Sequence, residues 1–374
     1  MSAETADVLV IGGGIAGASA AAELADSARV LLLEGEGQPG YHATGRSAAL
    51  FFQNYGSRPI RKLTAASRRF FESPPEGFSE HPLLGPRGVL IVAREDQLER
   101  LDAHEAEGHA LQRLTDREAR ALVPLLRPEA VSAALYEPDA QDIDVNALHL
   151  GFLRRFRAHG GRVVADARVE ALSRQAGVWR AQTRAGVFEA PLVVNAAGAW
   201  ADEVAAMAGL PRVGLTPMRR TAVIVEGPPE RAAARWPLTG CVEDTYYFKP
   251  ESGGKLMLSP ADETPDNPND AQPDELDVAI AVDRFVTAVD HEVRRIEHSW
   301  AGLRTFAPDR TPVAGWAEGR QDSGFFWLAG QGGYGIQTSP AMAMLAAALV
   351  TGAPLPEPLR AAGVDPAALS PARF

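Results

Sequence analysis

Three glycines close to the start of the chain, Gly12, Gly14 and Gly17, have the spacing of a loop that holds phosphate groups. In such a loop the first glycine permits a tight turn, the second lets the backbone approach a pyrophosphate, and the third lets a helix pack closely on a strand. The N–H groups at the start of the following helix, around Ile15 and Ala16, carry a partial positive charge that favours phosphate. The spacing therefore predicts a dinucleotide site.

Such a loop needs a strand before it and a helix after it, and the neighbouring residues predict both. The apolar run 7–11 is typical of a buried parallel strand, 15–26 of an alanine-rich helix, and 29–33 of a second strand. Glu34 ends that strand, where its carboxylate can accept hydrogen bonds from a ribose diol and would repel a 2′-phosphate. This βαβ unit disfavours NADP and leaves FAD and NAD open.

Strand-like and helix-like segments continue along the chain, with no internal repeat. A polar, proline-rich loop covers 260–273. We expect further strands at 89–93, 162–165, 169–172, 192–195, 222–225, 245–249, 256–258 and 325–328, and helices at 58–70, 95–109, 145–159, 198–208 and 275–289, with a last helix following 330–335 to about 350. Nucleotide-type and antiparallel segments interleave, so neither predicted domain is continuous in sequence.

Composition narrows the class of protein. The 374 residues include 48 acidic and 37 basic side chains, for a net charge of −11, which disfavours a nucleic-acid partner. Cys241 is the single cysteine, so the chain predicts no internal disulfide and no cysteine-based metal site. No apolar run is long enough to span a bilayer, and the N-terminus lacks a signal-peptide pattern. We expect a cytoplasmic protein with no metal ion, and peripheral membrane docking stays open.

Four blocks of sequence resemble the D-amino-acid oxidase-like family of FAD oxidoreductases, which includes glycine oxidase and DadA-type enzymes. They occur in the family's order and span nearly the whole chain: YHATGRSAA at 41–49, NAAGAW at 195–200, WAGLRT at 300–305 and GQGGYGIQT at 330–338. Within the family the strongest resemblance is to bacterial D-arginine dehydrogenases, at 64–68, 80–84 and the C-terminal block. The resemblance implies that FAD, not NAD, is the cofactor.

The resemblance also assigns residues to the cofactor. Gly332 to Gly335 open the last helix, so their N–H groups are expected to face the flavin and stabilise negative charge on it. His42 lies where some relatives attach flavin covalently, but the D-arginine-type chains with this histidine do not, so we expect non-covalent FAD. Besides the glycine loop and Glu34, the expected FAD contacts are Gly45, Arg46, Ser47, Ala48, Val169, Ala197, Gly198, Trp200, Arg304, Gly332, Gly333, Tyr334, Gly335, Ile336, Gln337 and Thr338.

For the substrate, the resemblance points first to Arg304, because a planar guanidinium can hold a carboxylate by two parallel hydrogen bonds. Tyr247 aligns with a tyrosine that helps hold the carboxylate. The same likeness places Tyr55, Arg220, Gly333 and Gln337 at the substrate pocket, with the Gly333 carbonyl facing the amine. No catalytic base is assigned, since the amine can lose its proton to water or to a pocket group.

Two positions depart from the D-arginine enzymes. Leu50 replaces a histidine, and Val89 replaces a glutamate that pairs with the cationic side chain of the substrate. Burying that cation without a partner would cost several kcal/mol. D-arginine is therefore expected to be a poor substrate, and a neutral or hydrophobic D-amino acid, or D-proline, a better one.

The predicted fold class is α/β: a Rossmann-like FAD-binding domain (1–80, 143–214 and 300–374) interleaved with a mixed, antiparallel-sheet substrate-binding domain (81–142 and 215–299). The predicted function is oxidative deamination of D-amino acids by hydride transfer from Cα to flavin N5, with quinone or oxygen as electron acceptor. Three alternatives stay open: a sarcosine- or glycine-type amine oxidase, a 2-hydroxy-acid dehydrogenase, and a non-catalytic FAD-binding subunit. Turnover separates the first two, and retention of Arg304 and Tyr247 argues against the third.

Overall fold

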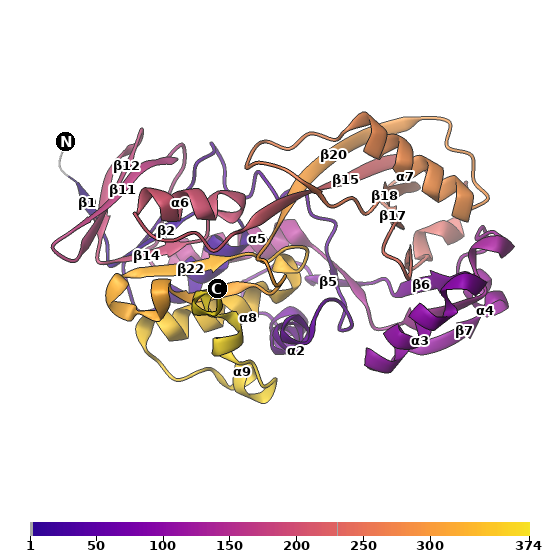
Figure 1. Cartoon of the computed structure of the whole chain (residues 1–374), viewed down its shortest axis with the longest axis horizontal. Coiled ribbons are helices and arrows are strands. Elements are labelled where there is room, and N and C mark those ends of the chain that lie inside the picture. Colours follow the sequence, from indigo (N-terminus) through magenta and orange to yellow (C-terminus); the bar gives the residue numbers. More distant parts are fainter. Residues whose placement is uncertain (1–2, 230) are drawn as a thin grey trace.

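The computed structural model of the chain describes residues 3–229 and 231–374. A six-stranded sheet forms the half of the molecule that contains the glycine-rich loop (Figure 1). Its strand order is β10-β3-β2-β14-β22-β21, parallel except for β21. The bounds are β2 Val8–Ile11, β3 Val30–Leu33, β10 Arg162–Val164, β14 Leu192–Asn195, β21 Val313–Trp316 and β22 Phe325–Ala329. The predicted βαβ unit is confirmed.

Both faces of this sheet are covered, which explains why its strands are apolar throughout. One face packs against helices and the other against a small four-stranded sheet of order β1-β13-β12-β11 and helix α6. The helices are α1 Ile15–Leu24, α2 Arg58–Glu72, α5 Val145–Ala158, α6 Ala201–Met207, α8 Gly335–Thr351 and α9 Glu357–Ala361. The small sheet comprises β1 Glu4–Thr5, β11 Val169–Gln175, β12 Val178–Thr183 and β13 Gly186–Ala190.

A nine-stranded sheet forms the other half of the molecule (Figure 1). Its order is β19-β15-β18-β17-β16-β6-β8-β7, with β20 paired to β15. The strands are β6 Val89–Ala93, β7 Gln112–Thr115, β8 Ala133–Glu137, β15 Thr216–Glu226, β16 Leu238–Cys241, β17 Tyr247–Glu251, β18 Lys255–Ser259, β19 Thr264–Pro265 and β20 Ile296–Phe306. Helices α3 Leu98–Glu107, α4 Asp116–Leu122 and α7 Glu275–Ala288 accompany it.

The antiparallel pair β15 and β20, within the large sheet, is the longest pairing in the described chain, and Ala301 and Leu303 of β20 pack with Ala199 of the other half. A third sheet has three strands in the order β4-β9-β5. Its strands are β4 Leu50–Phe51, β5 Leu84–Pro86 and β9 Gln141–Ile143, and strands of the nine-stranded sheet lie between β5 and β9 in sequence. The proposed domain limit between 299 and 300 lies inside β20, and the limit between 142 and 143 lies inside β9. Both limits therefore fall within strands and not in the segments that connect them.

Candidate active site

The glycine-rich loop lies where β2 ends and α1 begins. A Cβ atom on Gly17 would lie 1.8 Å from the Gly12 carbonyl oxygen, so only glycine permits this approach of helix to strand. Gly14 is the N-cap of α1 and has no side chain to cap the helix, but the Thr44 hydroxyl accepts from the N–H of the next residue, Ile15. The space beside Gly14 is open apart from the Thr44 hydroxyl, which would lie 3.3 Å from a Cβ atom at that position. The loop thus combines close packing with exposed helix N–H groups, which suits a pyrophosphate.

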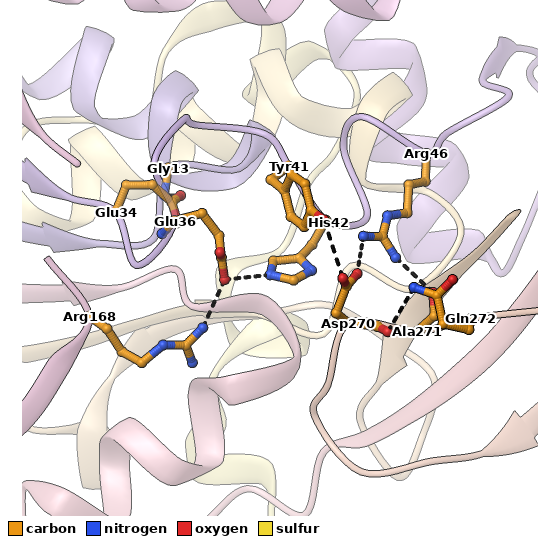
Figure 2. A network of polar contacts seen from close by, with 10 residues as sticks. All are labelled: Gly13, Glu34, Glu36, Tyr41, His42, Arg46, Arg168, Asp270, Ala271 and Gln272. Atoms are coloured by element: carbon orange, nitrogen blue, oxygen red, sulfur yellow. Dashed lines mark hydrogen bonds and ion pairs between the residues drawn. The ribbon is translucent and has the colours of Figure 1, made fainter. Parts of the chain in front are cut away.

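Glu34 supports this loop from the end of β3. Its carboxylate accepts hydrogen bonds from the backbone N–H groups of Gly13 and Glu36, each at 2.8 Å (Figure 2). Burial raises the pKa of Glu34, and the two backbone donors oppose that rise. The side chain therefore holds the loop in shape, and its remaining lone pairs line the cavity where a ribose was expected.

One cavity joins the glycine-rich loop to the large sheet, and many of the residues expected at the cofactor and substrate line it. Those that line it are Gly12, Gly14, Ile15, Ala16, Glu34, Arg46, Ser47, Ala48, Val169, Ala197, Gly198, Trp200, Arg220, Tyr247, Arg304, Gly332, Gly333, Gly335 and Ile336. Those outside its lining are Gly17, Gly45, Leu50, Tyr55, Val89, Tyr334, Gln337 and Thr338. The residues of the lining come from segments more than 300 positions apart, so one cavity can hold an extended cofactor and a small substrate.

Three side chains from different segments meet near the large sheet, where Arg304 and Tyr247 line the cavity and Tyr55 lies outside its lining. Arg304, on β20, donates from Nη1 to the Tyr55 hydroxyl at 3.3 Å and from Nη2 to the Tyr247 hydroxyl at 3.5 Å. Burial opposes the charge of Arg304, but the surrounding tyrosine and aspartate groups hold its pKa above the ordinary value. Arg304 is therefore a fixed cation whose guanidinium is oriented by two phenols.

The pKa of Tyr247 is shifted by the two neighbouring arginines, Arg304 and Arg220. Burial raises its pKa, but the Arg304 and Arg220 guanidinium groups outweigh burial, and the pKa lies below that of an ordinary tyrosine. Arg220 itself is buried, donating from Nε to the Asp262 carbonyl at 2.8 Å and from Nη2 to Glu263 at 3.3 Å. Its donors are thus directed at the loop after β18, and its charge acts on Tyr247 across the ring, 5.9 Å from the centroid.

Gly333 and Gln337 lie on either side of the start of α8. Gly333 lies beside Arg304, whereas Gln337 is buried against Phe52 and Thr64. A Cβ on Gly333 would lie 3.0 Å from both Arg304 Nη1 and the Tyr55 hydroxyl, so glycine leaves room beside the guanidinium. The Gln337 side chain is buried, accepting from the Phe52 N–H at 3.3 Å and donating to the Thr64 hydroxyl at 2.9 Å. Gln337 therefore fixes the segment that carries Phe52 and Tyr55.

Leu50 and Val89, the two departures from the D-arginine enzymes, lie together. With Ala140 they form a small apolar cluster, against which Phe52, Ile91 and Leu238 pack. Glu137 pairs across the sheet from Val89, and its carboxylate accepts from the Gln53 N–H at 2.6 Å and from Asn54 Nδ2 at 2.7 Å. The buried Glu137 carboxylate beside Val89 therefore already has two hydrogen-bond donors, Gln53 and Asn54.

Several residues of the site were missed by sequence reasoning. His149, on α5, has its Nε2 2.9 Å from the Gly13 carbonyl, and burial lowers its pKa, so the neutral ring donates to the glycine-rich loop. The Thr44 hydroxyl accepts from the Ile15 N–H at 2.9 Å. Thr44 belongs to a block that the sequence already marked, whereas nothing near His149 in the sequence signals its contact with Gly13.

A cluster of charged and aromatic side chains was missed at the Glu34 end of the cavity (Figure 2). Glu36 Oε1 lies 3.0 Å from His42 Nε2 and accepts from Arg168 Nη2 at 2.9 Å. The His42 ring packs on Trp200, with centroids 4.7 Å apart, and Arg168 lies over the same indole. Three separate segments are therefore joined around the cavity, and the Glu36 carboxylate is a polar partner of the His42 ring.

Arg46, expected at the flavin, lines the cavity but directs its guanidinium elsewhere. Nη1 donates to the carbonyl groups of Ala271 and Ala301, at 2.9 and 3.0 Å, and Nη2 pairs with Asp270 (Figure 2). The Trp300 indole in turn donates to the Arg46 carbonyl at 3.0 Å. Arg46 therefore links the cavity loop to β20 and to the loop before α7.

Two other kinds of feature are absent from residues 3–229 and 231–374. No helix within these ranges has the length and apolarity of a membrane-spanning segment. No group of three or more acidic, histidine or cysteine side chains in the same residues has the arrangement of a metal site.

Comparison with known proteins gives consistent matches over most of the chain. Residues 7–349 match the family described as FAD dependent oxidoreductase. Glycine oxidase of Geobacillus kaustophilus is 27% identical over 362 residues, covering 92% of each chain, and its crystal structure superposes with a TM-score of 0.83 over 94% of this chain and 96% of that one, at 25% identity. L-Proline dehydrogenase of P. horikoshii has the same fold, with a TM-score of 0.84 at 22% identity, covering 100% of this chain and 98% of the other.

Longer relatives match as well. Mitochondrial dimethylglycine dehydrogenase of Mus musculus is 26% identical over 367 residues, which cover 89% of this chain. The chain spans only 41% of the length of that relative.

Proposed function

This chain belongs to the family of FAD-dependent oxidoreductases, and from that premise we propose that it oxidises the α-carbon of a small amino acid. The proposed substrate is a D-amino acid with a neutral or apolar side chain, or a cyclic imino acid such as D-proline. The observation that carries the proposal is the Arg304 guanidinium in the wall of the cavity that begins at the glycine-rich loop, bonded to the hydroxyls of Tyr247 in the same wall and of Tyr55 just outside it. A fixed cation oriented by two phenols suits a carboxylate.

The residues of the cavity fit FAD. The start of α1, where Thr44 caps the Ile15 N–H and the Ala16 N–H follows, suits the pyrophosphate, and the Glu34 carboxylate suits a ribose diol. The start of α8, with Gly332, Gly333 and Gly335 on the cavity wall, suits the flavin. When bound, FAD supplies the acceptor for the hydride that leaves Cα.

The side chains of the protein then have three tasks. Arg304 holds the substrate carboxylate by two hydrogen bonds, and the phenols of Tyr55 and Tyr247 keep the guanidinium from rotating. The Gly333 carbonyl accepts a hydrogen bond from the substrate amine, which reacts as the neutral base. The substrate loses a hydride, and a proton passes to water or a pocket group, which leaves an imine. Water converts the imine of a primary amino acid to a 2-oxo acid and ammonia, whereas the cyclic imine formed from D-proline releases no ammonia.

Side-chain selectivity is proposed to follow from the cluster around Leu50 and Val89. The cluster is apolar, and the nearby Glu137 carboxylate is already engaged by Gln53 and Asn54. A cationic substrate side chain would find no free counter-charge there, at a cost of several kcal/mol. Non-covalent attachment of FAD is supported by the pairing of His42 with Glu36.

A second candidate is oxidation of glycine or an N-methylated glycine. It is favoured by the match to a glycine oxidase over 92% of both chains and by the fact that an arginine–tyrosine clamp suits any α-carboxylate. A 2-hydroxy acid fits the same clamp. A non-catalytic FAD-binding subunit is disfavoured, because such a protein has no need of Arg304 with two phenols on it.

The test is anaerobic mixing of the purified FAD-loaded protein with a substrate panel while the flavin absorbance is followed. Rapid bleaching by D-methionine, D-phenylalanine or D-proline, and slow bleaching by D-arginine and by the L-isomers, supports the proposal. Bleaching by glycine or sarcosine alone supports the second candidate. Bleaching by D-arginine ahead of all others contradicts the proposed pocket.

A further inference from the structure

The segment from Pro260 to Asp274, which we call the strap, crosses beside the cavity before α7 begins. Its first part is anchored on β15, where the Asp262 carboxylate accepts from the Thr221 N–H at 2.6 Å. Its last residue, Asp274, caps α7 by accepting from the Leu276 N–H at 2.9 Å. Between these anchors, Asn269 and Ala271 form part of the cavity lining. The middle of the strap is therefore a wall of the proposed cofactor cavity.

The middle of the strap is held by the loop that carries Arg46 (Figure 2). Asp270 pairs with Arg46 Nη2 and accepts from the Tyr41 hydroxyl at 3.2 Å, while the Ala271 carbonyl accepts from Arg46 Nη1 at 2.9 Å. Among the described residues, these are the only hydrogen bonds involving a side chain that join 267–272 to residues outside the strap. Ala271 is also buried against Ala301 and Leu303, so the Asp270–Arg46 pair is the charged part of a contact that apolar packing completes.

Arg46 and Asp270 differ in solvent exposure, so Asp270 can move into water while Arg46 stays in place. The Arg46 side chain is 14% exposed and keeps the carbonyl of Ala301 as a partner, whereas the Asp270 side chain is 48% exposed. Opening the strap would move Asp270 and Ala271 into water. Arg46 would stay bonded to the carbonyl of Ala301 on β20. Because Asp270 is about half exposed, water can replace Arg46 as its partner, so the pair can open without unfolding of the protein.

We propose that the strap is the gate through which FAD enters and leaves the cavity, and that the Asp270–Arg46 pair is its latch. The proposal rests on the assignment of this cavity to FAD. Asp270 is a positioning residue in this scheme, because it acts through Arg46 and the strap. A latch slows passage in both directions, so its loss speeds association and dissociation of FAD together and changes the equilibrium affinity little.

The test compares Asp270→Asn with the full-length wild-type protein. Release is followed by the fluorescence of FAD after dilution of the loaded protein, and uptake by quenching of FAD fluorescence on mixing with the FAD-free protein. Both rate constants are expected to rise about 5-fold, the change that 1 kcal/mol produces, with the dissociation constant changed less than about 2-fold. Asp270→Glu keeps the charge and is expected to release FAD at a rate nearer to wild type.

Asp322→Asn is the matched control, since it removes the exposed aspartate of another arginine pair, Arg320–Asp322. Salt gives a second readout: 1 M NaCl is expected to speed release from wild type but not from Asp270→Asn, because salt screens the pair. Equal rates for Asp270→Asn and Asp322→Asn overturn the latch, and so does faster release with unchanged uptake, which marks a simple binding contact. A wild-type protein that never takes up FAD refutes the cavity assignment itself, and the latch with it.

Discussion

Arg304 donates a hydrogen bond to the Tyr55 hydroxyl across 3.3 Å, although the two residues are 249 positions apart in sequence. The contact joins β20 of the large sheet to the loop that follows β4. It sets the orientation of the guanidinium before any substrate arrives. Preorganisation of this kind converts a charge into a binding site of defined geometry.

Arg304→Lys tests whether geometry, and not charge alone, holds the substrate. Lysine keeps the positive charge but cannot make two parallel hydrogen bonds to a carboxylate. We expect kcat/KM for the best D-amino acid to fall at least about 100-fold, corresponding to about 3 kcal/mol, the value of one strong charge-assisted hydrogen bond. The measurement is anaerobic flavin reduction in a stopped-flow instrument. The control Arg320→Lys, at an exposed pair, is expected to behave as wild type, and an unchanged kcat/KM in Arg304→Lys contradicts the clamp.

Tyr247→Phe tests the lowered pKa of Tyr247. Burial raises that pKa, but Arg304 and Arg220 lower it more, so Tyr247 ionises at a lower pH than a free tyrosine. The tyrosinate would repel a carboxylate and neutralise Arg304, so kcat/KM is expected to fall as pH rises through the pKa of Tyr247. The phenylalanine variant lacks the ionising group, and its kcat/KM is expected to show no such fall over that range.

The neighbouring residue supplies a matched control for this pH profile. Burial raises the pKa of Tyr246, and that side chain packs in the apolar core of the large sheet. Tyr246→Phe is therefore expected to keep the alkaline fall seen in wild type. If Tyr247→Phe also keeps it, another group causes the fall and Tyr247 does not meet the substrate.

Two glycines of the glycine-rich loop, Gly17 and Gly14, are expected to serve different purposes: Gly17 permits close packing of the helix, and Gly14 leaves space for the cofactor. In Gly17→Ala the new methyl would lie 1.8 Å from the Gly12 carbonyl oxygen, so the backbone must shift, at a cost of about 3 kcal/mol. In Gly14→Ala the methyl meets only the Thr44 hydroxyl, at 3.3 Å, and occupies space on the cavity side. We expect Gly17→Ala to lower the Tm of the FAD-free protein by several degrees, and Gly14→Ala to leave that Tm nearly unchanged but weaken FAD binding about 10-fold or more. Equal effects of the two changes on the FAD-free Tm contradict this distinction.

Local patterns in the sequence were sufficient to predict the glycine-rich turn, its flanking strands and most helices. The runs of apolar residues at β2, β3 and β14 mark strands buried on both faces, and α7 was placed to within one residue of its end. These features depend on neighbours within a few positions. The short strands β12 and β13, which lie partly exposed, were missed.

The arrangement of the site depends on contacts between distant segments, which no local pattern contains. The register of β15 with β20 pairs Met218 with Arg304 and Arg220 with Gly302, and a shift of one residue would turn Arg304 to the other face of the sheet. The guanidinium of Arg46 is directed to Asp270, 224 positions away, a contact that its position beside the flavin-side block did not indicate. The resemblance to the family predicted the role of Arg304, and the register of β15 with β20 determines which residues of β15 lie beside it.

Val89→Glu tests the proposed selectivity for neutral side chains. The new carboxylate would enter the cluster of Leu50, Ala140 and Phe52, where it could pair with a cationic substrate side chain. We expect the ratio of kcat/KM for D-arginine to that for D-methionine to rise at least about 10-fold, since a buried ion pair lost or gained changes binding by more than about 1.4 kcal/mol. Val89→Gln has nearly the same shape without the charge and is the matched control. If both variants change the ratio equally, shape and not charge sets the preference, and if neither changes it, the substrate side chain does not lie beside Val89.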